Sequence, residues 1–354
     1  MTTVVVTGIL GQDGANMAEY LLSQNEDIKV YGLMRRSSNP NFINTQKFHT
    51  HPKFEYIYGD LGDEISIDNI VKSVQPDYFI NFAANSFVGC SWDMPLQVMD
   101  TNAIGVVRCL ESIKKFKPDC RFYSAGSSEQ FGDVDYSPQD INHPFKPRSP
   151  YGASKCAAHH MVKVYRESHD LYAVHGILFN HEGTKRGEEF VTRKISKGVA
   201  RINKAMELDA PYAPIELGNL DAKRDWSDSE DFIEGVWLML NQDTPKDYVL
   251  ASGEAHSIRE FVERSFRVAG IEGSWNGAGV DEEYICSSGT TLVKINKDFF
   301  RPAEVELLLG DSTPIQKELG WKLKVSFDEL VEKMVRHDMR EINNVQDNSR
   351  SVSA

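Results

Sequence analysis

The segment VVVTGILGQDGANMAEYL, residues 4–21, constrains the fold more than any other part of the sequence. Gly8, Gly11 and Gly14 separate an apolar run that predicts a strand from a pattern that predicts a helix. Glycines at this spacing permit a tight turn and a close approach of the backbone to a pyrophosphate at the helix N-terminus. Because the turn follows the first strand and opens the first helix, we predict a dinucleotide site, with a ligand-free glycine turn as the alternative.

Strand and helix patterns alternate through the first half of the sequence. Apolar runs predict strands at 3–8, 29–35, 54–61, 77–84, 120–126 and 172–180, and helical patterns fall at 14–24, 66–74, 97–116 and 151–169. This alternation predicts an α/β fold of the Rossmann type, with a doubly wound parallel sheet. Beyond residue 180 the pattern becomes irregular, with helices near 189–205, 228–241 and 257–269, which predicts a smaller mixed α/β C-terminal domain that binds the substrate.

The end of the second predicted strand indicates which dinucleotide is bound. NAD enzymes commonly carry an acidic residue there, which accepts a hydrogen bond from the ribose 2′-hydroxyl. This sequence instead has Arg35, Arg36 and Ser37, and two guanidinium groups at that place would attract a 2′-phosphate. We therefore predict NADP as the cofactor.

The stretch SPYGASK places Tyr151 and Lys155 four residues apart, on one face of a helix predicted to begin at Ser149 and Pro150. A phenol has a pKa of about 10 and is a poor base at neutral pH. A neighbouring ammonium group and an oxidised nicotinamide both favour the phenolate, so Tyr151 can serve as a base. The same spacing arises by chance in many helices, but here it follows a dinucleotide turn.

The segment YSAGSSEQFG ends another predicted strand and brings Ser127, Ser128 and Glu129 together. An enzyme that only transfers hydride could use one hydroxyl to hold a substrate oxygen, but it has no evident need of the carboxylate. The segment is therefore either a polar turn or a catalytic group with an additional proton-transfer task.

Several motifs together resemble those of one family. The glycine turn and Y-x-x-x-K resemble the extended short-chain dehydrogenase/reductase superfamily, and TGILGQDG, RRSS, SSEQFG, SPYGASK, ILFNHEGTKRGEEFVTRKI, RDW and FRPAEVELLLGD resemble GDP-mannose 4,6-dehydratases. The resemblance covers about residues 3–335. The sequence departs from the family pattern at Ser127, where threonine is usual, at Gln130 and Phe131, where leucine and tyrosine are common, and at Gln97, where tyrosine is common.

The resemblance implies a complete reaction. Tyr151, helped by Lys155, would take the proton of the sugar C4 hydroxyl as hydride passes to NADP⁺, and the new ketone would acidify the C5 proton. Glu129 would remove that proton and protonate the departing C6 hydroxyl, after which hydride returns from NADPH to C6. The implied enzyme is a lyase that converts GDP-D-mannose to GDP-4-keto-6-deoxy-D-mannose, the first step of GDP-deoxysugar biosynthesis. Its implied catalytic residues are Ser127, Glu129, Tyr151 and Lys155.

The resemblance also completes the two predicted binding sites. The predicted cofactor site comprises Gly8, Leu10, Gly11, Gln12, Asp13, Gly14, Arg35, Arg36, Ser37, Asp60, Leu61, Phe82, Ala83, Ala84, Ser86, Tyr151, Lys155, His181 and Arg186. The predicted substrate site comprises Ser86, Ser127, Ser128, Glu129, Asn180, Val191, Lys194, Gly218, Arg224, Arg301 and Glu304. Lys194 and Arg224 would face the pyrophosphate, Arg301 would add cationic hydrogen bonds, and Glu304 would hold a ribose hydroxyl.

The formal net charge of −13 argues against a general nucleic-acid-binding protein. An anionic ligand then needs a local concentration of cations, which the segment TKRGEEFVTRK supplies through Lys185, Arg186, Arg193 and Lys194. The alternative for this segment is a solvated surface of mixed charge.

The composition also limits the surroundings of the protein. The sequence contains no run of about 18 apolar residues and no signal-peptide pattern at its start, so we expect no membrane association and a cytoplasmic location. The five cysteines have no CxxC pair, which favours reduced thiols and no metal site.

We divide the chain into an NADP-binding Rossmann domain at 1–175, to which later segments return, a mainly nucleotide-sugar-binding domain at 176–340, and a flexible tail at 341–354. By resemblance, the polar loop 36–53 would help build a cofactor site shared between subunits, which predicts a dimer or tetramer; the alternative is a disordered surface loop. Two other functions stay open: a dehydratase or epimerase for another nucleotide sugar, such as a GDP-heptose, and a non-catalytic NADP-binding sensor. Glu129 argues against a simple 4-epimerase, which needs no base at C5.

Overall fold

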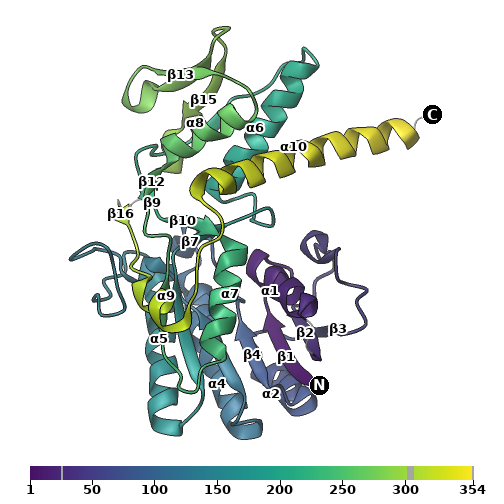
Figure 1. Ribbon diagram of the computed structural model, residues 1–354, viewed down its shortest axis with the longest axis vertical. Helices are drawn as coiled ribbons and strands as arrows, with labels where there is room; N and C mark the ends of the chain where they lie inside the picture. The colour runs from purple at the N-terminus through teal and green to yellow at the C-terminus, as the bar shows by residue number, and fades with distance from the viewer. Residues whose placement is uncertain (25–26, 301–306, 353–354) are drawn as a thin grey trace.

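The computed structural model describes residues 1–24, 27–300 and 307–352, with side chains as far as Asn344 (Figure 1). Its largest sheet has seven strands in the order β11-β6-β5-β4-β1-β2-β3, and every neighbouring pair is parallel. The strands are β1 (Thr2–Thr7), β2 (Ile28–Met34), β3 (Phe54–Tyr58), β4 (Tyr78–Asn81), β5 (Arg121–Ala125), β6 (Ala173–Leu178) and β11 (Tyr248–Leu250). The strand order reverses between β1 and β4, where ligands bind in doubly wound sheets, and the predicted Rossmann-type fold is confirmed.

Helices cover both faces of this sheet. Alternate residues of each strand point to opposite sides, so one strand contributes to the cores on both faces. Val4 and Val6 of β1 belong to the core that includes α1 and α7, and Val5 belongs to the core that includes α2, α4 and α5. These helices are α1 (Gln12–Ser23), α2 (Glu64–Val74), α4 (Gly105–Phe116), α5 (Pro150–His169) and α7 (Ser229–Leu240). Helix α7 and strand β11, which come from the later part of the chain, pack with the elements of the first half.

The second domain lies above the first in Figure 1 and has its own apolar core. Its four-stranded sheet has the order β13-β14-β15-β8, with antiparallel pairs except for the parallel pair β15 and β8. The elements are α6 (Val191–Glu207), β8 (Ile215–Leu217), α8 (Ile258–Val268), β13 (Gly273–Asn276), β14 (Glu283–Cys286), β15 (Thr291–Ile295) and α10 (Phe327–Val352). The segment predicted as a tail from residue 341 is helical as far as Val352.

Two small sheets join the domains beside the carboxyl ends of the large sheet. One pairs β7 with β10 in parallel, and the other has the order β12-β9-β16. Their strands are β7 (Asn180–Glu182), β9 (Lys223–Arg224), β10 (Trp226–Asp228), β12 (His256–Ser257) and β16 (Leu307–Leu308). The short elements are α3 (Pro95–Met99), α9 (Thr313–Leu319), the 3₁₀ turns η1 (Ile43–Thr45), η2 (Gly89–Trp92), η4 (Ser128–Gln130), η5 (Gly279–Asp281) and η6 (Lys297–Phe299), and the π-helical turn η3 (Asp100–Ile104).

The segment predicted as a helix at 97–116 is helical throughout, but it contains a π-helical turn. It consists of α3, the π-helical turn η3 and α4, and the buried Asn102 lies within the turn. The Asn102 amide accepts a hydrogen bond from Asn85 N at 2.8 Å and donates to Asn85 O at 3.2 Å and to Ser154 Oγ at 3.1 Å. The helix α5 begins as predicted, because Ser149 Oγ accepts from Gly152 N at 3.0 Å and Pro150 follows it.

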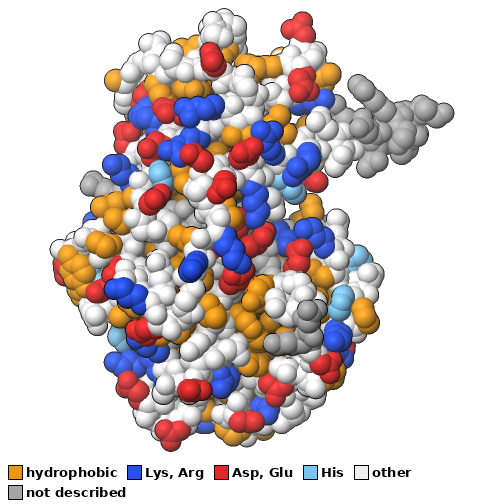
Figure 2. Space-filling model, viewed as in Figure 1, with side chains coloured by type: hydrophobic (Ala, Val, Ile, Leu, Met, Phe, Trp, Pro, Cys, Tyr) orange, Lys and Arg blue, Asp and Glu red, His pale blue; other side chains and the backbone are white. Residues whose placement is uncertain are grey.

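The surface mixes both signs of charge. On the face drawn in Figure 2, Lys and Arg side chains alternate with Asp and Glu side chains over both domains. Within the described residues, no helix is long and apolar enough to cross a membrane.

Candidate active site

A cavity of about 1060 Å³ opens at the carboxyl ends of the parallel strands, between the Rossmann domain and the second domain. The turn between β1 and α1, the ends of β2 to β5, the start of α5 and the segment from β7 to α6 all contribute to its wall. The domain boundary thus gathers side chains that are far apart in the sequence.

The glycine turn has the geometry that its sequence predicts. Gly8 has a φ of +67°, and its carbonyl accepts from Gly11 N at 2.9 Å. A Cβ at Gly14 would lie 2.4 Å from Gly8 O, so a side chain there would not fit without a backbone shift. The first turn of α1 therefore faces the cavity with its backbone N–H groups, the arrangement that binds phosphate.

The end of β2 contributes one of the two predicted arginines. Arg35 and Ser37 line the cavity, whereas the exposed Arg36 donates from Nη1 to Ser37 O. The loop that follows β2 packs against the glycine turn and against the segment between β7 and α6. Asn44 Nδ2 of this loop donates to Leu10 O at 3.0 Å and to Lys185 O at 3.3 Å. A side chain just after a strand can point into the cavity or away from it, and the sequence alone does not decide which holds for Arg36.

Tyr151 and Lys155 lie side by side at the start of α5, and both are buried. Lys155 Nζ lies 5.8 Å from the centre of the Tyr151 ring and donates to Ala125 O at 2.7 Å. Burial raises the pKa of Tyr151 to about 12, although a hydrogen bond with Ser127 favours the phenolate. Burial lowers the pKa of Lys155 to about 8. The shift of Tyr151 toward neutrality that the sequence predicts therefore requires the charge of a bound oxidised nicotinamide.

Ser127, Ser128 and Glu129 lie where β5 ends, and we call them the catalytic turn after the role that the sequence predicts for them. Ser127 is the N-cap of η4, and its Oγ accepts from Glu129 N at 3.3 Å. Glu129 is half-buried and lines the cavity, and a Cβ at Gly152 of α5 would lie only 2.5 Å from Glu129 O. This close approach packs the backbone of Glu129 against the start of the helix that carries Tyr151.

His181 and Asp13 face each other on the cofactor side of the cavity. His181 Nε2 lies 3.0 Å from Asp13 Oδ2, and its Nδ1 lies 2.7 Å from Phe179 O. Burial alone would lower the pKa of His181, but the Asp13 carboxylate outweighs it and raises that pKa. Burial likewise opposes ionisation of Asp13, yet His181 lowers the Asp13 pKa to about 2. The raised pKa of His181 and the lowered pKa of Asp13 both favour an ion pair between them.

Lys194 and Arg224, which the sequence predicts to bind the substrate, both line the cavity. Lys194 Nζ lies 3.7 Å from the centre of the Phe299 ring, and burial lowers the pKa of Lys194. Arg224 ends the short strand β9 and donates from Nη1 to Lys223 O at 2.9 Å. Both cations line the cavity, as an anionic ligand requires.

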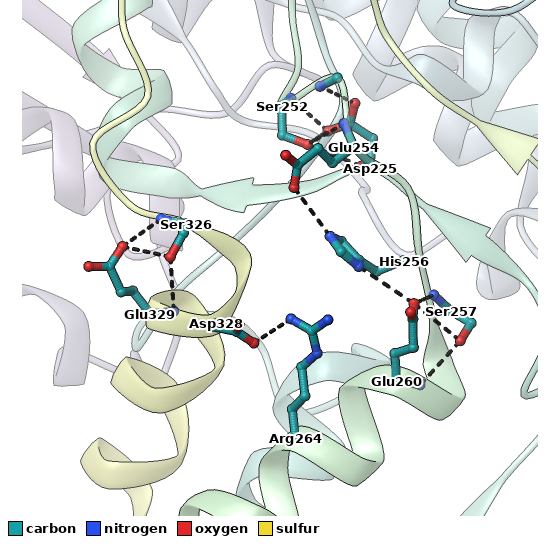
Figure 3. Close-up of polar contacts among 11 residues, drawn as sticks. Asp225, Ser252, Glu254, His256, Ser257, Glu260, Arg264, Ser326, Asp328 and Glu329 are labelled. Atoms are coloured by element: carbon teal, nitrogen blue, oxygen red, sulfur yellow. Dashed lines mark hydrogen bonds and ion pairs between the residues drawn. The ribbon is translucent and has the colours of Figure 1, made fainter.

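The buried Asp225 holds the strand that carries Arg224. Its carboxylate accepts from Ser252 N at 2.7 Å, from Gly253 N at 2.9 Å and from Gly310 N at 3.2 Å. Figure 3 shows this carboxylate turned toward Ser252, with His256 of the neighbouring strand between two glutamates. Asp225 thereby ties the loop after β11 and the loop after β16 to the end of the strand that carries Arg224.

The basic segment at 184–194 is only partly a ligand site. Lys185, Arg186 and Lys194 line the cavity, but Arg193 points away from it. Arg193 Nη2 lies 2.9 Å from Asp338 Oδ1 of α10, and its Nη1 donates to Thr184 O at 2.7 Å. Helical periodicity separates Arg193 from its neighbour Lys194, so the buried cation stabilises the packing of α6 on α10.

Most of the predicted site residues line this one cavity. The predicted residues that line it are Gly8, Leu10, Gly11, Gln12, Asp13, Gly14, Arg35, Ser37, Asp60, Leu61, Phe82, Ala83, Ala84, Ser86, Ser127, Ser128, Glu129, Tyr151, Lys155, Asn180, His181, Arg186, Val191, Lys194, Gly218 and Arg224. Arg36 is not among them, and Arg301 and Glu304 lie outside the described residues. Other residues that line the cavity were not predicted from the sequence, among them Asn44, Asn85, Phe87, Trp92, Thr101, Trp226 and Phe299.

Comparison with known proteins identifies the family. The sequence profile of the family described as GDP-mannose 4,6 dehydratase matches residues 5–334. The chain belongs to this family. A GDP-mannose 4,6 dehydratase from Drosophila melanogaster is 43% identical over 345 residues, covering 95% of this chain and 85% of that protein. The human GDP-mannose 4,6 dehydratase is 42% identical and covers 95% of this chain and 91% of its own length. The GDP-mannose 4,6-dehydratase of Vibrio cholerae is 41% identical, with 95% and 93% covered.

Solved structures share the fold of this family member at low sequence identity. The dTDP-glucose 4,6-dehydratase of Bacillus anthracis in complex with NAD gives a TM-score of 0.80 at 19% identity and covers 97% of this chain and 98% of its own. The RMD protein of Pseudomonas aeruginosa complexed with NADPH gives 0.75 at 20% identity, with 96% and 100% covered. These similarities bear on the fold alone.

The cavity fits a dinucleotide on structural grounds. The glycine turn packs the start of α1 closely onto the end of β1, and Gln12 Oε1 is buried with no hydrogen-bond partner in the described part of the chain. A bound ligand with a donor group would satisfy that oxygen. Among the described residues, no group of three or more His, Cys, Asp and Glu side chains is arranged to hold a metal ion.

Proposed function

We propose that this protein catalyses the 4,6-dehydration of GDP-mannose to GDP-4-keto-6-deoxy-mannose. The observation that carries the proposal is the position of Glu129 in the same cavity wall as Ser127 and Tyr151. Tyr151 and Lys155 suffice for oxidation of an alcohol, so a carboxylate at this place supplies the proton transfer that elimination of water requires. Membership of the family whose relatives carry that name supports the same reaction.

The cofactor in this proposal is NADP, which would lie along the glycine turn and the ends of β2 to β4. When bound, its nicotinamide supplies a reversible hydride acceptor for C4 and donor for C6. Arg35 favours NADP over NAD, because its guanidinium lines the cavity where the adenosine ribose of a dinucleotide would lie. The ion pair of His181 and Asp13 would orient the groups around the start of α1.

The residues of the chain then divide the proton transfers. Tyr151 accepts the proton of the C4 hydroxyl, and the ammonium of Lys155 stabilises its phenolate. Ser127 donates its hydroxyl hydrogen to the developing C4 oxygen. Glu129 removes the C5 proton, which the C4 ketone acidifies, and transfers a proton to the leaving C6 hydroxyl. At the other end of the substrate, Lys194 and Arg224 neutralise the pyrophosphate.

We further propose a homo-oligomer in a reducing, cytoplasmic setting. Leu96 of α3 is 86% exposed, and the nearby Met99 and Ile104 are also exposed. This segment packs against α5, which carries the exposed Val164. An apolar surface of this kind on the outer face of the Rossmann domain favours burial against a second copy. All five cysteines are free thiols, which supports a reducing compartment.

Substrate identity is tested by incubating the purified protein with GDP-mannose and, in parallel, with a GDP-heptose, without an added reductant. The proposal predicts that GDP-mannose loses the mass of one water and that the protein regenerates its own cofactor. Turnover of the GDP-heptose with no reaction of GDP-mannose would overturn the substrate, and no reaction of either would overturn the enzyme class.

A further inference from the structure

Gln130 lies directly behind the catalytic turn, and its side chain is fully buried. Its side-chain oxygen Oε1 accepts a hydrogen bond from Ser127 N at 2.9 Å and lies 3.0 Å from Nε2 of His175 on β6. One oxygen atom therefore joins the catalytic turn to a strand of the large sheet.

These two contacts determine which atoms of Gln130 and His175 carry hydrogen where the two side chains meet. A backbone N–H can only donate, so the atom of Gln130 that faces Ser127 is the oxygen and not the amide nitrogen. Because that oxygen can only accept, His175 Nε2 must carry a hydrogen. Burial, together with His159 and Lys155, lowers the pKa of His175 well below its usual value. The ring is therefore neutral, with its hydrogen on Nε2.

The surroundings of His175 leave it little freedom. His175 N donates to Asp247 Oδ1 at 2.7 Å, and Asp247 accepts two hydrogen bonds from Arg166 at 2.7 and 2.9 Å. On the opposite side, a Cβ at Gly126 would lie 2.3 Å from His175 Nε2 and 2.7 Å from Gln130 Oε1. Glycine at this position gives the two side chains the room to meet.

We propose that Gln130 and His175 are positioning residues that hold Ser127 and Glu129 in their reactive geometry. The hydrogen bond from Ser127 N closes the capping box of η4 and so sets the backbone from which Ser127 Oγ reaches Glu129 N. Without the hydrogen bonds to Gln130 Oε1, the turn can rotate. That rotation displaces the Ser127 hydroxyl and the Glu129 carboxylate together. The inference rests on the proposed dehydration, because it assigns these two residues to that reaction.

Variants of His175 test the proposal by the separation of kcat from KM. His175→Leu removes the Nε2 donor, and His175→Gln places an amide N–H near the same point. His159→Leu is the matched control, since His159 packs edge-on against His175 with a ring-centre distance of 5.0 Å and its Nδ1 has no hydrogen-bond partner among the described residues. All three are assayed as the full chain with GDP-mannose.

We expect His175→Leu to lower kcat about 10- to 100-fold with little change in KM, because a small misplacement of reacting groups costs rate and not binding. We expect His175→Gln to recover most of the rate and His159→Leu to stay within about twofold of the wild type. Equal losses in His175→Leu and His159→Leu, or no recovery in His175→Gln, would overturn the proposal.

The tautomer of His175 gives a second test. It uses the wild-type protein, so it depends neither on the folding of a variant nor on an activity assay. In wild-type protein with ¹⁵N-labelled histidine, we expect the His175 resonances of a neutral ring with hydrogen on Nε2 throughout the range around neutral pH. A ring with hydrogen on Nδ1, or an imidazolium, would contradict the proposal. A wild-type protein that leaves GDP-mannose unchanged would instead refute the proposed function, so the two failures are distinguishable.

Discussion

Both ring nitrogens of His181 face oxygen acceptors: Nε2 lies 3.0 Å from Asp13 Oδ2, and Nδ1 lies 2.7 Å from Phe179 O. Only an imidazolium can donate from both nitrogens, which agrees with the raised pKa of His181. The cavity wall thus contains a half-buried histidine whose charge is balanced by the Asp13 carboxylate.

This ion pair predicts how stability depends on pH. The raised pKa of His181 stabilises the folded protein fully below about pH 6.5, the ordinary histidine value, and this stabilisation is lost as the pH rises through the folded pKa. The Asp13 contribution is present above the ordinary aspartate pKa of 3.8 and is lost as the pH falls through about 2. The free energy of unfolding, measured with urea, should therefore fall more between pH 6 and pH 9 in the wild type than in His181→Gln. Equal falls would refute the ion pair.

Arg35 and Arg36 should differ in their effect on cofactor binding. Arg35 lines the cavity, whereas Arg36 donates to the backbone of Ser37. A hydrogen bond to a charged group contributes about 1.5–3 kcal/mol, so Arg35→Ala should weaken NADP binding about 10- to 100-fold and leave NAD binding nearly unchanged. Arg36→Ala, the matched control, should weaken NADP binding less than about threefold. Calorimetric titration measures both, and similar losses in the two variants would refute this assignment.

Tyr151 should remain a neutral phenol in the protein without cofactor. Burial raises its pKa to about 12, so ultraviolet titration of the wild type and of Tyr151→Phe should give the same tyrosinate absorbance up to about pH 10. Addition of NADP⁺ should bring the ionisation of Tyr151 to lower pH, because a positive charge then faces the phenol. A phenolate at neutral pH before NADP⁺ is added would contradict the burial that the structure assigns to this ring.

Asp225 should stabilise the folded protein strongly. Removal of its carboxylate in Asp225→Ala leaves the N–H groups of Ser252, Gly253 and Gly310 without their acceptor. The expected loss in the free energy of unfolding is about 3–5 kcal/mol, as for other broken buried charge networks. Asp221→Ala, which breaks an exposed ion pair with Arg259, should cost less than about 1 kcal/mol. Chemical denaturation of the two variants compares them directly.

Local spacing explains why much of the site could be predicted from the sequence. The glycine turn and the pair Tyr151 and Lys155 depend on contacts within a few residues, and the geometry of one strand, turn or helix fixes them. The alternation of elements then places their ends along one edge of the sheet, so most predicted ligand residues meet in one cavity.

The features that the sequence did not reveal depend on tertiary contacts. Gln130 meets His175 across 45 positions, and Arg193 meets Asp338 on a different helix. The π-helical turn at Asn102 likewise depends on the distant Asn85 and Ser154. No local pattern distinguishes a buried partner of this kind from an ordinary polar residue, so only the packed structure identifies these roles.

The central claim is that Glu129 converts an oxidation at C4 into the loss of water. The most direct measurement uses GDP-mannose with deuterium at C4 and follows the label by mass spectrometry and NMR. The wild type should lose one water and carry the label at C6 of the product. Glu129→Gln should still bind NADP but lose dehydration by at least about 100-fold, whereas Asp133→Asn, an exposed acid nearby, should leave it unchanged. Undiminished water loss in Glu129→Gln, or a wild-type product without the label at C6, would contradict the account.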